Sequence, residues 1–333
     1  MLGVLIMNTG TPDNPTPDAI RPYLKQFLSD RNLIDVPRFI WNPILNHCIL
    51  PNRPKKTAPH YEAFWTDEGS PFLLTSLAQR DALRTRLGEL AGEPIAVELG
   101  MRYGNPSIAS ALDALLDAGV DQIVALPMYP QNTRACAGTC LEEFDRAFAS
   151  AVASRPDALR PEVRHVLHYW DAPGYLDALA ASVRRSWEYA AGKKLVVSFH
   201  SIPVCHQKEG DTYPESTKAT ALGLAEKLGV KDEDLVVAYQ SRFDSRRWLG
   251  PFLNSELQRL GACGVNDVAV VCPIFSVDCI ETRFDVDQDA RREFLSAARQ
   301  ANTPDPRYTY VPALGADAAF IDVLANLVLN RNH

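Results

Sequence analysis

The chain lacks any stretch that is long and apolar enough to cross a bilayer. Its longest apolar region runs from Val36 to Pro51, is interrupted by Pro37 and Pro43, and falls short of the roughly 20 residues that a membrane span needs. Residues Met1–Met7 lack a basic leader and a small-residue cleavage site, so they indicate a first strand rather than a signal peptide. These absences predict a cytoplasmic protein.

The sequence also lacks a basic excess and a cysteine framework. It has 34 Lys and Arg against 41 Asp and Glu, a formal net charge of -7, and no basic block, which argues against nucleic acid as a partner. Its seven cysteines are odd in number and dispersed, so disulfides are not expected. Cys136 and Cys140 have no second pair at a matching interval, so we expect two small helix residues rather than a zinc or iron–sulfur site.

Motifs of several common enzyme classes are missing as well. No G-x-G-x-x-G or G-x-x-x-x-G-K-[ST] follows a strand-like run, so no sequence motif predicts nucleotide binding. The G-x-S-x-G turn of serine hydrolases is absent. The function must therefore be sought in other residues.

What is present is a regular alternation of strand-like and helix-like stretches. Apolar, β-branched runs recur along the chain with amphipathic stretches such as 17–29, 107–118, 175–190 and 216–228 between them. This alternation predicts an α/β fold with parallel sheets that are flanked by helices. The predicted strands are 3–8, 95–101, 122–128, 163–168, 195–200, 235–240, 267–275 and 308–312.

The eight runs divide four and four, and the two halves resemble one another. Val4–Pro12 is similar to Leu195–Pro203, and Gly119–Tyr129 is similar to Gly264–Phe275. Between these stretches, Met101–Gly104 is echoed by Ser241–Asp244. The shared order predicts an internal duplication. We predict domains at 1–155 and 156–315, separated by a polar, proline-broken stretch at 154–161, and a closing helix at 316–333.

The chemistry is predicted where the strand Leu195–His200 ends. Ligands bind at the carboxyl ends of strands in open α/β sheets, and His200 stands at such an end. After the seventh strand, a helix is expected to begin near Ser276 or Asp278 and to carry Asp278, Glu281 and Asp285 on one face, with Asp289 continuing it. A solvated acidic face is the simplest interpretation. The shared strand edge favours a second one, in which His200 and the carboxylates handle a metal ion or a proton.

Other side chains follow strands toward the same edge. Arg102 and Tyr103 follow the second strand, Tyr129 the third, and Trp248 lies shortly after the sixth. Each alone fits a structural role. Together they predict a cleft with aromatic walls, basic groups on one side and acidic groups on the other, which suits a large, flat, apolar ligand that carries carboxylates.

These motifs resemble the ferrochelatase (protohaem ferro-lyase) family of the Gram-negative bacterial type. The resemblance spans the chain and rests on motifs in family order, ending with Phe275-Ser-Val-Asp-Cys-Ile-Glu-Thr282. The earlier ones are Asn8-Thr-Gly-Thr-Pro12, Phe27-Leu-Ser-Asp30, Thr66-Asp-Glu-Gly-Ser-Pro71, Met101-Arg-Tyr-Gly-Asn-Pro106, Tyr129-Pro-Gln131, Ser198-Phe-His-Ser-Ile-Pro203, Glu209-Gly-Asp211, Tyr213-Pro-Glu215 and Tyr239-Gln-Ser-Arg-Phe243. The resemblance implies two Rossmann-like domains of the type II chelatase kind with a porphyrin cleft between them.

The resemblance also implies roles for individual residues. His200 and Glu281 match the catalytic and metal-handling pair, and Asp278 and Asp285 match acidic positions that relay protons or metal. His200 as proton acceptor and His200 as metal ligand both stay open. The positions that match the porphyrin-binding wall are Thr9, Arg102, Tyr103, Tyr129, Arg134, Ser201 and Trp248.

The expected reaction is insertion of ferrous iron into a porphyrin in haem biosynthesis. Protoporphyrin IX is the expected substrate, with coproporphyrin III as the alternative. No tightly bound cofactor is implied, and because Asn330–His333 brings no cysteine-bearing extension, no [2Fe–2S] cluster is expected. The proline-broken stretch after Phe27 matches a lip that implies peripheral contact with the inner face of the membrane, and neighbouring haem-pathway enzymes are possible partners.

The chain departs from the family pattern at Thr9, Arg134, Arg283 and Asp285. Thr9 and Arg134 stand at the expected porphyrin wall, and Arg283 follows the Glu-Thr pair where leucine is usual. These departures keep two alternatives open. One is a chelatase for another metal or tetrapyrrole, and the other is a tetrapyrrole-binding protein without catalytic activity.

Overall fold

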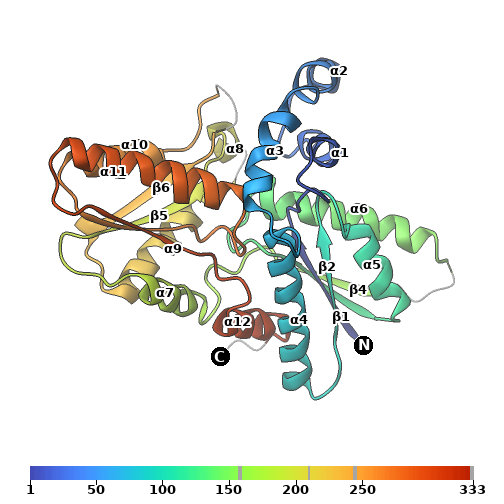
Figure 1. Cartoon of the computed structure of the whole chain (residues 1–333). Coiled ribbons are helices and arrows are strands. Elements are labelled where there is room, and N and C mark those ends of the chain that lie inside the picture. The colour runs from blue at the N-terminus through green and yellow to red at the C-terminus, as the bar shows by residue number, and fades with distance from the viewer. Residues whose placement is uncertain (157–159, 209–210, 243–245, 331–333) are drawn as a thin grey trace. The chain divides into compact units, whose positions relative to one another are not determined.

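The computed structural model describes residues 1–156, 160–208, 211–242 and 246–330, and the chain divides into two compact units (Figure 1). Unit 1 comprises Met1–His168 with Leu324–His333, and unit 2 comprises Tyr169–Val323. Parts of three predicted features lie outside the described residues. They are residues 157–159 of the predicted boundary, residues 331–333 at the C-terminus, and Glu209, Gly210, Phe243 and Asp244 of the motifs.

Unit 1 is built on a four-stranded parallel sheet. Its strands are β1 (Leu2–Asn8), β2 (Ala96–Met101), β3 (Gln122–Pro127) and β4 (Glu162–His165), in the order β2-β1-β3-β4. The helices are α1 (Pro17–Leu28), α2 (Arg38–Pro43), α3 (Arg53–Phe64), α4 (Pro71–Ala91), α5 (Ile108–Asp117) and α6 (Thr139–Ala153), with π-helical segments η1 (Ile44–Ile49) and η2 (Arg134–Gly138).

Unit 2 repeats this plan. Its strands are β5 (Lys194–His200), β6 (Leu235–Gln240), β7 (Asp267–Val271) and β8 (Arg307–Val311), all parallel, in the order β6-β5-β7-β8. The helical elements are α7 (Tyr175–Ser186), α8 (Val204–Lys208), α9 (Tyr213–Leu228), η3 (Asp232–Asp234), α10 (Leu253–Ala262), η4 (Glu281–Ala290) and α11 (Arg291–Gln300). The last helix, α12 (Ala318–Val328), is shared between the two units.

The central strands are apolar because both sides of each sheet are covered. Val4 to Met7 on β1 and Leu195 to Val197 on β5 are fully buried. In unit 2, the strands pack against α10, η4 and α11 through one buried cluster that includes Val196, Leu257, Val286 and Phe294. This is the continuous hydrophobic pattern expected of parallel strands in α/β proteins, and the predicted fold class is confirmed.

The matching strand orders and registers agree with an internal repeat, but they correct one part of the predicted alignment. Asn8 pairs with Met101 in unit 1, and Phe199 pairs with Tyr239 in unit 2. The backbone N–H of Met101 donates to Pro106 and that of Tyr239 donates to Pro251, so Met101 corresponds to Tyr239. The predicted match of Met101 to Ser241 is therefore wrong. The register instead makes Arg102 the counterpart of Gln240, and Thr9 the counterpart of His200.

Three predicted boundaries differ from the structure. The predicted domain boundary at 155–156 lies before β4, whereas this strand pairs with β3 and belongs to unit 1. The seventh strand ends at Val271 rather than at residue 275, because Pro273 has no N–H for the ladder. The helical segment that follows starts at Ile280 and Glu281, not at Ser276 or Asp278.

The first motif contains a glycine that the backbone requires. Gly10 has φ +109°, and a Cβ atom there would lie 1.8 Å from the carbonyl oxygen of Tyr103. The loop after β1 therefore touches the loop after β2, because residue 10 has no side chain. This contact brings the two sequence motifs of unit 1 together.

Candidate active site

His200 is the last residue of β5, the central strand beside β6 and β7. Its Nδ1 atom lies 2.7 Å from the carbonyl oxygen of Ser201. A carbonyl oxygen can only accept, so Nδ1 carries the proton and donates, which leaves the lone pair of the neutral ring on Nε2. The Tyr213 hydroxyl donates to the carbonyl oxygen of His200 at 3.0 Å and holds the strand end in place. His200 is half-buried, so its ring is held in a fixed orientation in which Nε2 has a lone pair that can accept a proton or bind a metal ion.

Three carboxylates follow one another at intervals of four on η4. Glu281, Asp285 and Asp289 are all half-buried on this helix, whose backbone hydrogen bonds have the wider i→i+5 spacing of a π-helix. The sequence predicted an acidic row on an α-helix that also included Asp278. The row is present without Asp278, and the helix type was not predicted.

The pKa of Asp285 is affected by His200 and by the other two carboxylates of η4. Burial raises the pKa of Asp285, and the charges of Glu281 and Asp289 raise it further. The Ser241 hydroxyl, which donates to Asp285 Oδ2 at 2.7 Å, lowers the pKa of Asp285, as does the nearby His200 ring. Asp285 therefore binds a proton more readily than an exposed aspartate does, beside the imidazole.

Asp278 lies before η4 and is bound to the neighbouring strand. Its Oδ1 atom accepts from the Tyr310 hydroxyl at 2.5 Å, from the backbone N–H of Ala313 at 3.2 Å and from Thr282 Oγ1 at 3.2 Å. These bonds fix the loop between β7 and η4 to the end of β8. The sequence did not indicate this role, because Tyr310 and Ala313 lie more than 30 residues away along the chain.

Two buried thiols lie near the acidic row. Burial raises the pKa of the Cys279 thiol well above its ordinary value, and the Glu281 carboxylate, to which it is hydrogen bonded, raises the pKa further. Burial likewise raises the pKa of Cys272 at the end of β7. Both thiols therefore stay protonated near neutral pH. Of the two cysteines predicted as helix residues, Cys140 is buried and Cys136 is half-buried.

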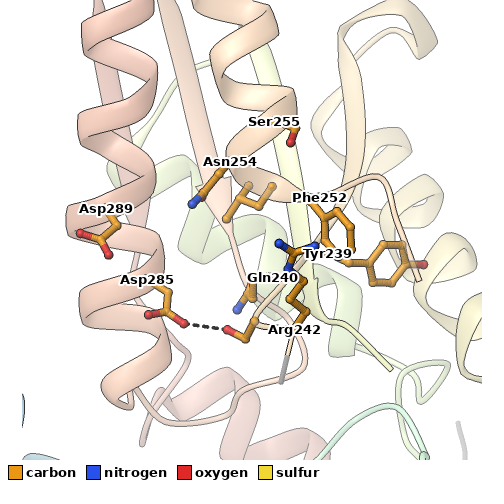
Figure 2. Close-up of a pocket in the computed structure, with 10 residues that line it drawn as sticks. Tyr239, Gln240, Arg242, Phe252, Asn254, Ser255, Asp285 and Asp289 are labelled. Atoms are coloured by element: carbon orange, nitrogen blue, oxygen red, sulfur yellow. Dashed lines mark hydrogen bonds between the residues drawn. The ribbon is translucent and has the colours of Figure 1, made fainter. Parts of the chain in front are cut away.

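A polar pocket opens at the carboxyl end of β6 (Figure 2). It has a volume of about 370 Å³ and is lined by the end of β6, the start of α10 and η4. Its side chains include Gln240, Ser241, Arg242, Asn254, Asp285 and Asp289. Ser241 has φ 61°, a backbone conformation that a serine rarely adopts. This turn ends the strand and directs the serine hydroxyl to Asp285.

Two predicted porphyrin-binding residues hold the loop that follows β5. The Ser201 hydroxyl donates to the carbonyl oxygen of Leu249 at 2.7 Å, and the Leu249 N–H donates to Ile202 at 2.9 Å. Trp248 forms a bridge with Pro203, and the Arg246 guanidinium lies 6.0 Å from its ring centre. Ser201 and Trp248 therefore lie at the same strand end as His200.

The predicted site residues of unit 1 form a separate network around Asp30. Arg102 Nη2 lies 2.6 Å and the Tyr103 hydroxyl 2.7 Å from Asp30 Oδ2, and the Thr139 hydroxyl donates to the same oxygen. Burial would raise the pKa of Asp30, but these donors, the Asn32 N–H and the Arg102 charge lower it below its usual value. Arg102 is thus paired with a buried carboxylate, which is the kind of structural role that the sequence also allowed. The role of Asp30 as the partner of Arg102 was not predicted, because the two residues are far apart in the sequence and no local spacing connects them.

The other predicted residues of unit 1 are also in contact with polar partners. The hydroxyls of Thr9 and Tyr129 form a short hydrogen bond at the ends of β1 and β3. Arg134 Nε donates to Asn32 Oδ1 at 3.1 Å, on the stretch that follows α1. The structure therefore brings Thr9 to Tyr129, and Arg102 to Tyr103, whereas Arg134 bonds to Asn32.

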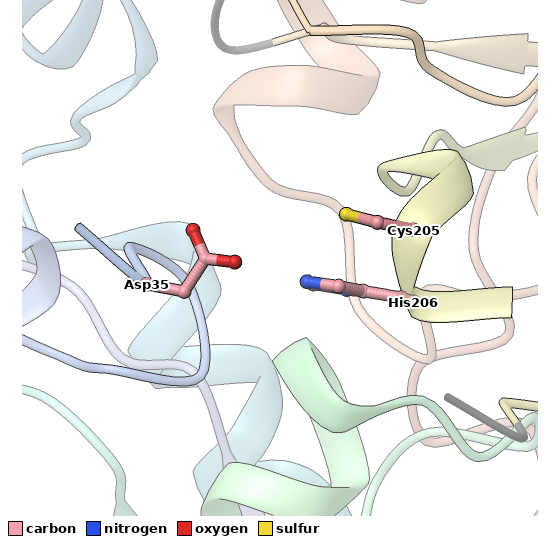
Figure 3. A group of neighbouring side chains, drawn as sticks. All are labelled: Asp35, Cys205 and His206. Carbon is pink, nitrogen blue, oxygen red and sulfur yellow. The ribbon is translucent and has the colours of Figure 1, made fainter. Parts of the chain in front are cut away.

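Helix α8 carries a cysteine and a histidine that no sequence argument singled out. Cys205 is exposed and His206 is buried, and Figure 3 draws them with Asp35. Asp35 belongs to unit 1, whereas Cys205 and His206 belong to unit 2. No metal site is assigned to the three.

Comparison with known proteins gives one family over the whole chain. The family model described as Ferrochelatase matches residues 1–332. A ferrochelatase of Actinobacillus pleuropneumoniae serotype 5b is 42% identical over 327 residues, which cover 98% of this chain and 97% of the relative. A ferrochelatase of Chromobacterium violaceum is 42% identical over 330 residues, covering 99% and 87%, and Ferrochelatase 1 of Shewanella oneidensis is 42% identical over 329 residues, covering 98% and 94%.

Two solved structures share the fold at low sequence identity. SirB from Bacillus subtilis, solved with Fe³⁺, has a TM-score of 0.54 and 12% identity, covering 79% of this chain and 92% of that one. DR2241 from Deinococcus radiodurans, described as a multi-domain protein with structural similarity to chelatases, has a TM-score of 0.54 and 13% identity, covering 98% of this chain and 55% of that one. At these identities the likeness concerns the fold alone.

Proposed function

The chain belongs to the ferrochelatase family, enzymes that insert iron into porphyrin, and we propose that His200 and Glu281 carry this reaction with protoporphyrin IX as substrate. The observation that supports these roles is the fixed imidazole of His200. Its Nδ1–H is held by Ser201, its Nε2 atom has a lone pair, and the ring interacts electrostatically with Asp285 of η4.

The reaction requires groups that accept protons. A neutral porphyrin loses two pyrrole protons as a divalent iron enters, so the site must supply groups that accept both of them. The His200 Nε2 atom accepts a proton or binds the iron, and Glu281 supplies negative charge beside it. A site that holds the macrocycle bent exposes its nitrogen lone pairs to the metal. Asp285 then receives a proton from this centre.

The test is anaerobic metallation of the purified protein, followed by absorbance. His200→Ala and Glu281→Gln should each lower turnover by about 100-fold or more while porphyrin binding, measured by fluorescence, remains. His165→Ala and Glu293→Gln are the matched controls, since His165 lies on β4 and Glu293 is on α11 bonded to Gln258, and both should retain activity. Near-wild-type turnover of either site variant would refute the assignment.

The choice of substrate is tested in the same assay. We propose protoporphyrin IX because the relatives described above are Gram-negative bacterial ferrochelatases. Both protoporphyrin IX and coproporphyrin III are offered with ferrous iron, cobalt or zinc. Faster turnover of coproporphyrin III would contradict the proposed preference. Metallation by cobalt alone would favour a chelatase for another metal, and binding without any metallation would favour a carrier.

We also propose that a patch on unit 1 touches a membrane surface. Among the described residues, no helix has both the length and the apolar character that a bilayer crossing requires. The segment of α2 and η1 nevertheless exposes large apolar side chains: Phe39 is 80% exposed, Ile40 46% and Ile44 40%. Such side chains beside Arg38 favour shallow insertion at an anionic lipid surface.

We also propose that the protein carries no iron–sulfur cluster. The iron and acid-labile sulfide content of the pure protein tests it. A 2:2 content of iron and sulfide would overturn it.

A further inference from the structure

We propose that Gln240 is a positioning residue, whose side-chain N–H groups hold a water molecule beside Asp285 and so give the proton released in metallation a way out of the site. This inference rests on the proposed function. Gln240 is the last residue of β6 and pairs with His200 in the sheet. It is therefore the nearest β6 position to the imidazole.

The orientation of the Gln240 amide is set by two donors. Its Oε1 atom accepts from the Ser198 hydroxyl and from Cys272 Sγ, which lies 3.8 Å away. Because burial keeps the Cys272 thiol protonated, this thiol donates rather than accepts. With the amide oxygen bound to these two groups, the amide nitrogen must face the opposite way.

The amide nitrogen has no protein partner among the described residues. Gln240 is only 4% exposed, and its Nε2 atom is buried without a hydrogen bond. Buried donors are nearly always satisfied by protein or ordered water. The unmet N–H groups therefore indicate that a further acceptor occupies this place in the working enzyme.

The surroundings favour water as that acceptor. Gln240 lines the 370 Å³ pocket, and Figure 2 shows its side chain on the side where Asp285 lies, with Ser241 bonded to Asp285. A water molecule accepts from an amide N–H and donates to a carboxylate, and it needs only a small fraction of this volume. An anion would be repelled by Asp285 and Asp289, which share the pocket.

At the equivalent position of unit 1, the charge of a buried carboxylate is neutralised by an arginine. There the counterpart of Gln240 is Arg102, whose charge neutralises Asp30. In unit 2 the same position holds a neutral amide, which donates hydrogen bonds without adding a positive charge.

The base of the proposed reaction, His200 Nε2 once it is protonated, gives its proton to the water oxygen. The water releases one of its own protons to an Asp285 oxygen. The base is regenerated, the water molecule is unchanged, and the proton then leaves through the pocket. Gln240 takes no part in bond making. It fixes the water so that the transfer occurs within hydrogen-bond distance.

Two variants separate this role from a structural one. Gln240→Glu keeps an oxygen for Ser198 and Cys272 but loses the N–H donors, and Gln240→Leu removes both. With ferrous iron and protoporphyrin IX, each should lower kcat by about tenfold or more, with the porphyrin Kd nearly unchanged and a larger solvent deuterium isotope effect. Gln258→Leu on α10, outside the pocket, is the matched control and should retain wild-type kcat.

The outcomes are distinct from those that test the proposed function. If either Gln240 variant keeps kcat within twofold of the wild type, or loses porphyrin binding and kcat in equal measure, the inference is overturned. A larger isotope effect with intact binding supports it. If the wild-type protein metallates neither porphyrin, it is the proposed function that fails.

Discussion

Arg102 and Asp30 form an ion pair at the carboxyl edge of the first sheet, with 2.6 Å between Nη2 and Oδ2 and with the Asp30 side chain only 3% exposed. The same Asp30 oxygen accepts from Tyr103 and Thr139. Since the charge of Arg102 is used within the protein, its first contribution is to hold α1, β2 and α6 together. Binding of a substrate carboxylate would have to compete with this pair.

The stability of the protein should depend strongly on Arg102. Arg102→Leu leaves the buried Asp30 carboxylate without its cation, and we expect the free energy of unfolding to fall by about 3–5 kcal/mol. Urea denaturation measures this loss. Arg155, whose partners Asp113 and Asp117 are exposed, is the control, and Arg155→Leu should cost less than about 1 kcal/mol. Equal losses in the two variants would show that the Asp30 pair is not an important buried contact.

Neutralising Asp285 should raise stability and lower activity. The folded-state pKa of Asp285 lies above its unfolded value, so its contribution to stability falls as the pH rises from the unfolded value through the folded pKa. Asp285→Asn removes this dependence, and at pH 7 its Tm should exceed that of the wild type by about 2 °C or more. Metallation should slow in the same variant.

The control for this prediction is an exposed carboxylate. Asp67→Asn, in the turn before α4, should change neither Tm nor its pH dependence. Thermal unfolding from pH 4 to pH 8 compares the three proteins. A lower Tm for Asp285→Asn at pH 7 would mean that the Ser241 hydrogen bond outweighs the repulsion from Glu281 and Asp289.

The close contact between α10 and α11 should tolerate no side chain at Gly261. A Cβ atom there would lie 2.7 Å from the carbonyl oxygen of Phe294 and 2.8 Å from the nitrogen of Ala298. Gly261→Ala should therefore cost about 1–3 kcal/mol in urea unfolding. At Gly88 on α4 the nearest atom would be 3.7 Å away, so Gly88→Ala should stabilise by about 0.4–1 kcal/mol. The same sign for both variants would contradict this packing.

The exposed apolar side chains of unit 1 should govern membrane binding. Replacing Phe39 and Ile40 by serine should weaken sedimentation with anionic phospholipid vesicles by about tenfold or more, because two large apolar groups no longer enter the lipid. Leu222→Ser is the control, since Leu222 is 45% exposed on α9 of unit 2. Unchanged binding of the double variant would remove the proposed membrane contact.

The sequence predicted those features that depend on local pattern. Eight parallel strands, the repeat, and the positions of His200 and Glu281 follow from hydrophobic runs and from residues at strand ends. Features that depend on distant partners were not predictable. Asp278 was placed in the acidic row because its spacing fits an α-helix, yet the structure bonds it to Tyr310 and starts a π-helix after it. Asp30 stood out only as the end of the motif Phe27-Leu-Ser-Asp30, and its pairing was not predictable because Arg102 and Thr139 contact it from other elements.

The equal strand orders of the two sheets also concern the history of the chain. Thr9 holds the place in the first sheet that His200 holds in the second, and Arg102 the place of Gln240. After a gene duplication, two copies of one ancestral half can diverge separately under selection. In the first half the equivalent strand ends carry a threonine and an arginine that neutralises a carboxylate, and in the second half they carry an imidazole and a neutral amide. One backbone plan therefore supports two strand edges of different chemistry, and the difference lies in the side chains at the strand ends.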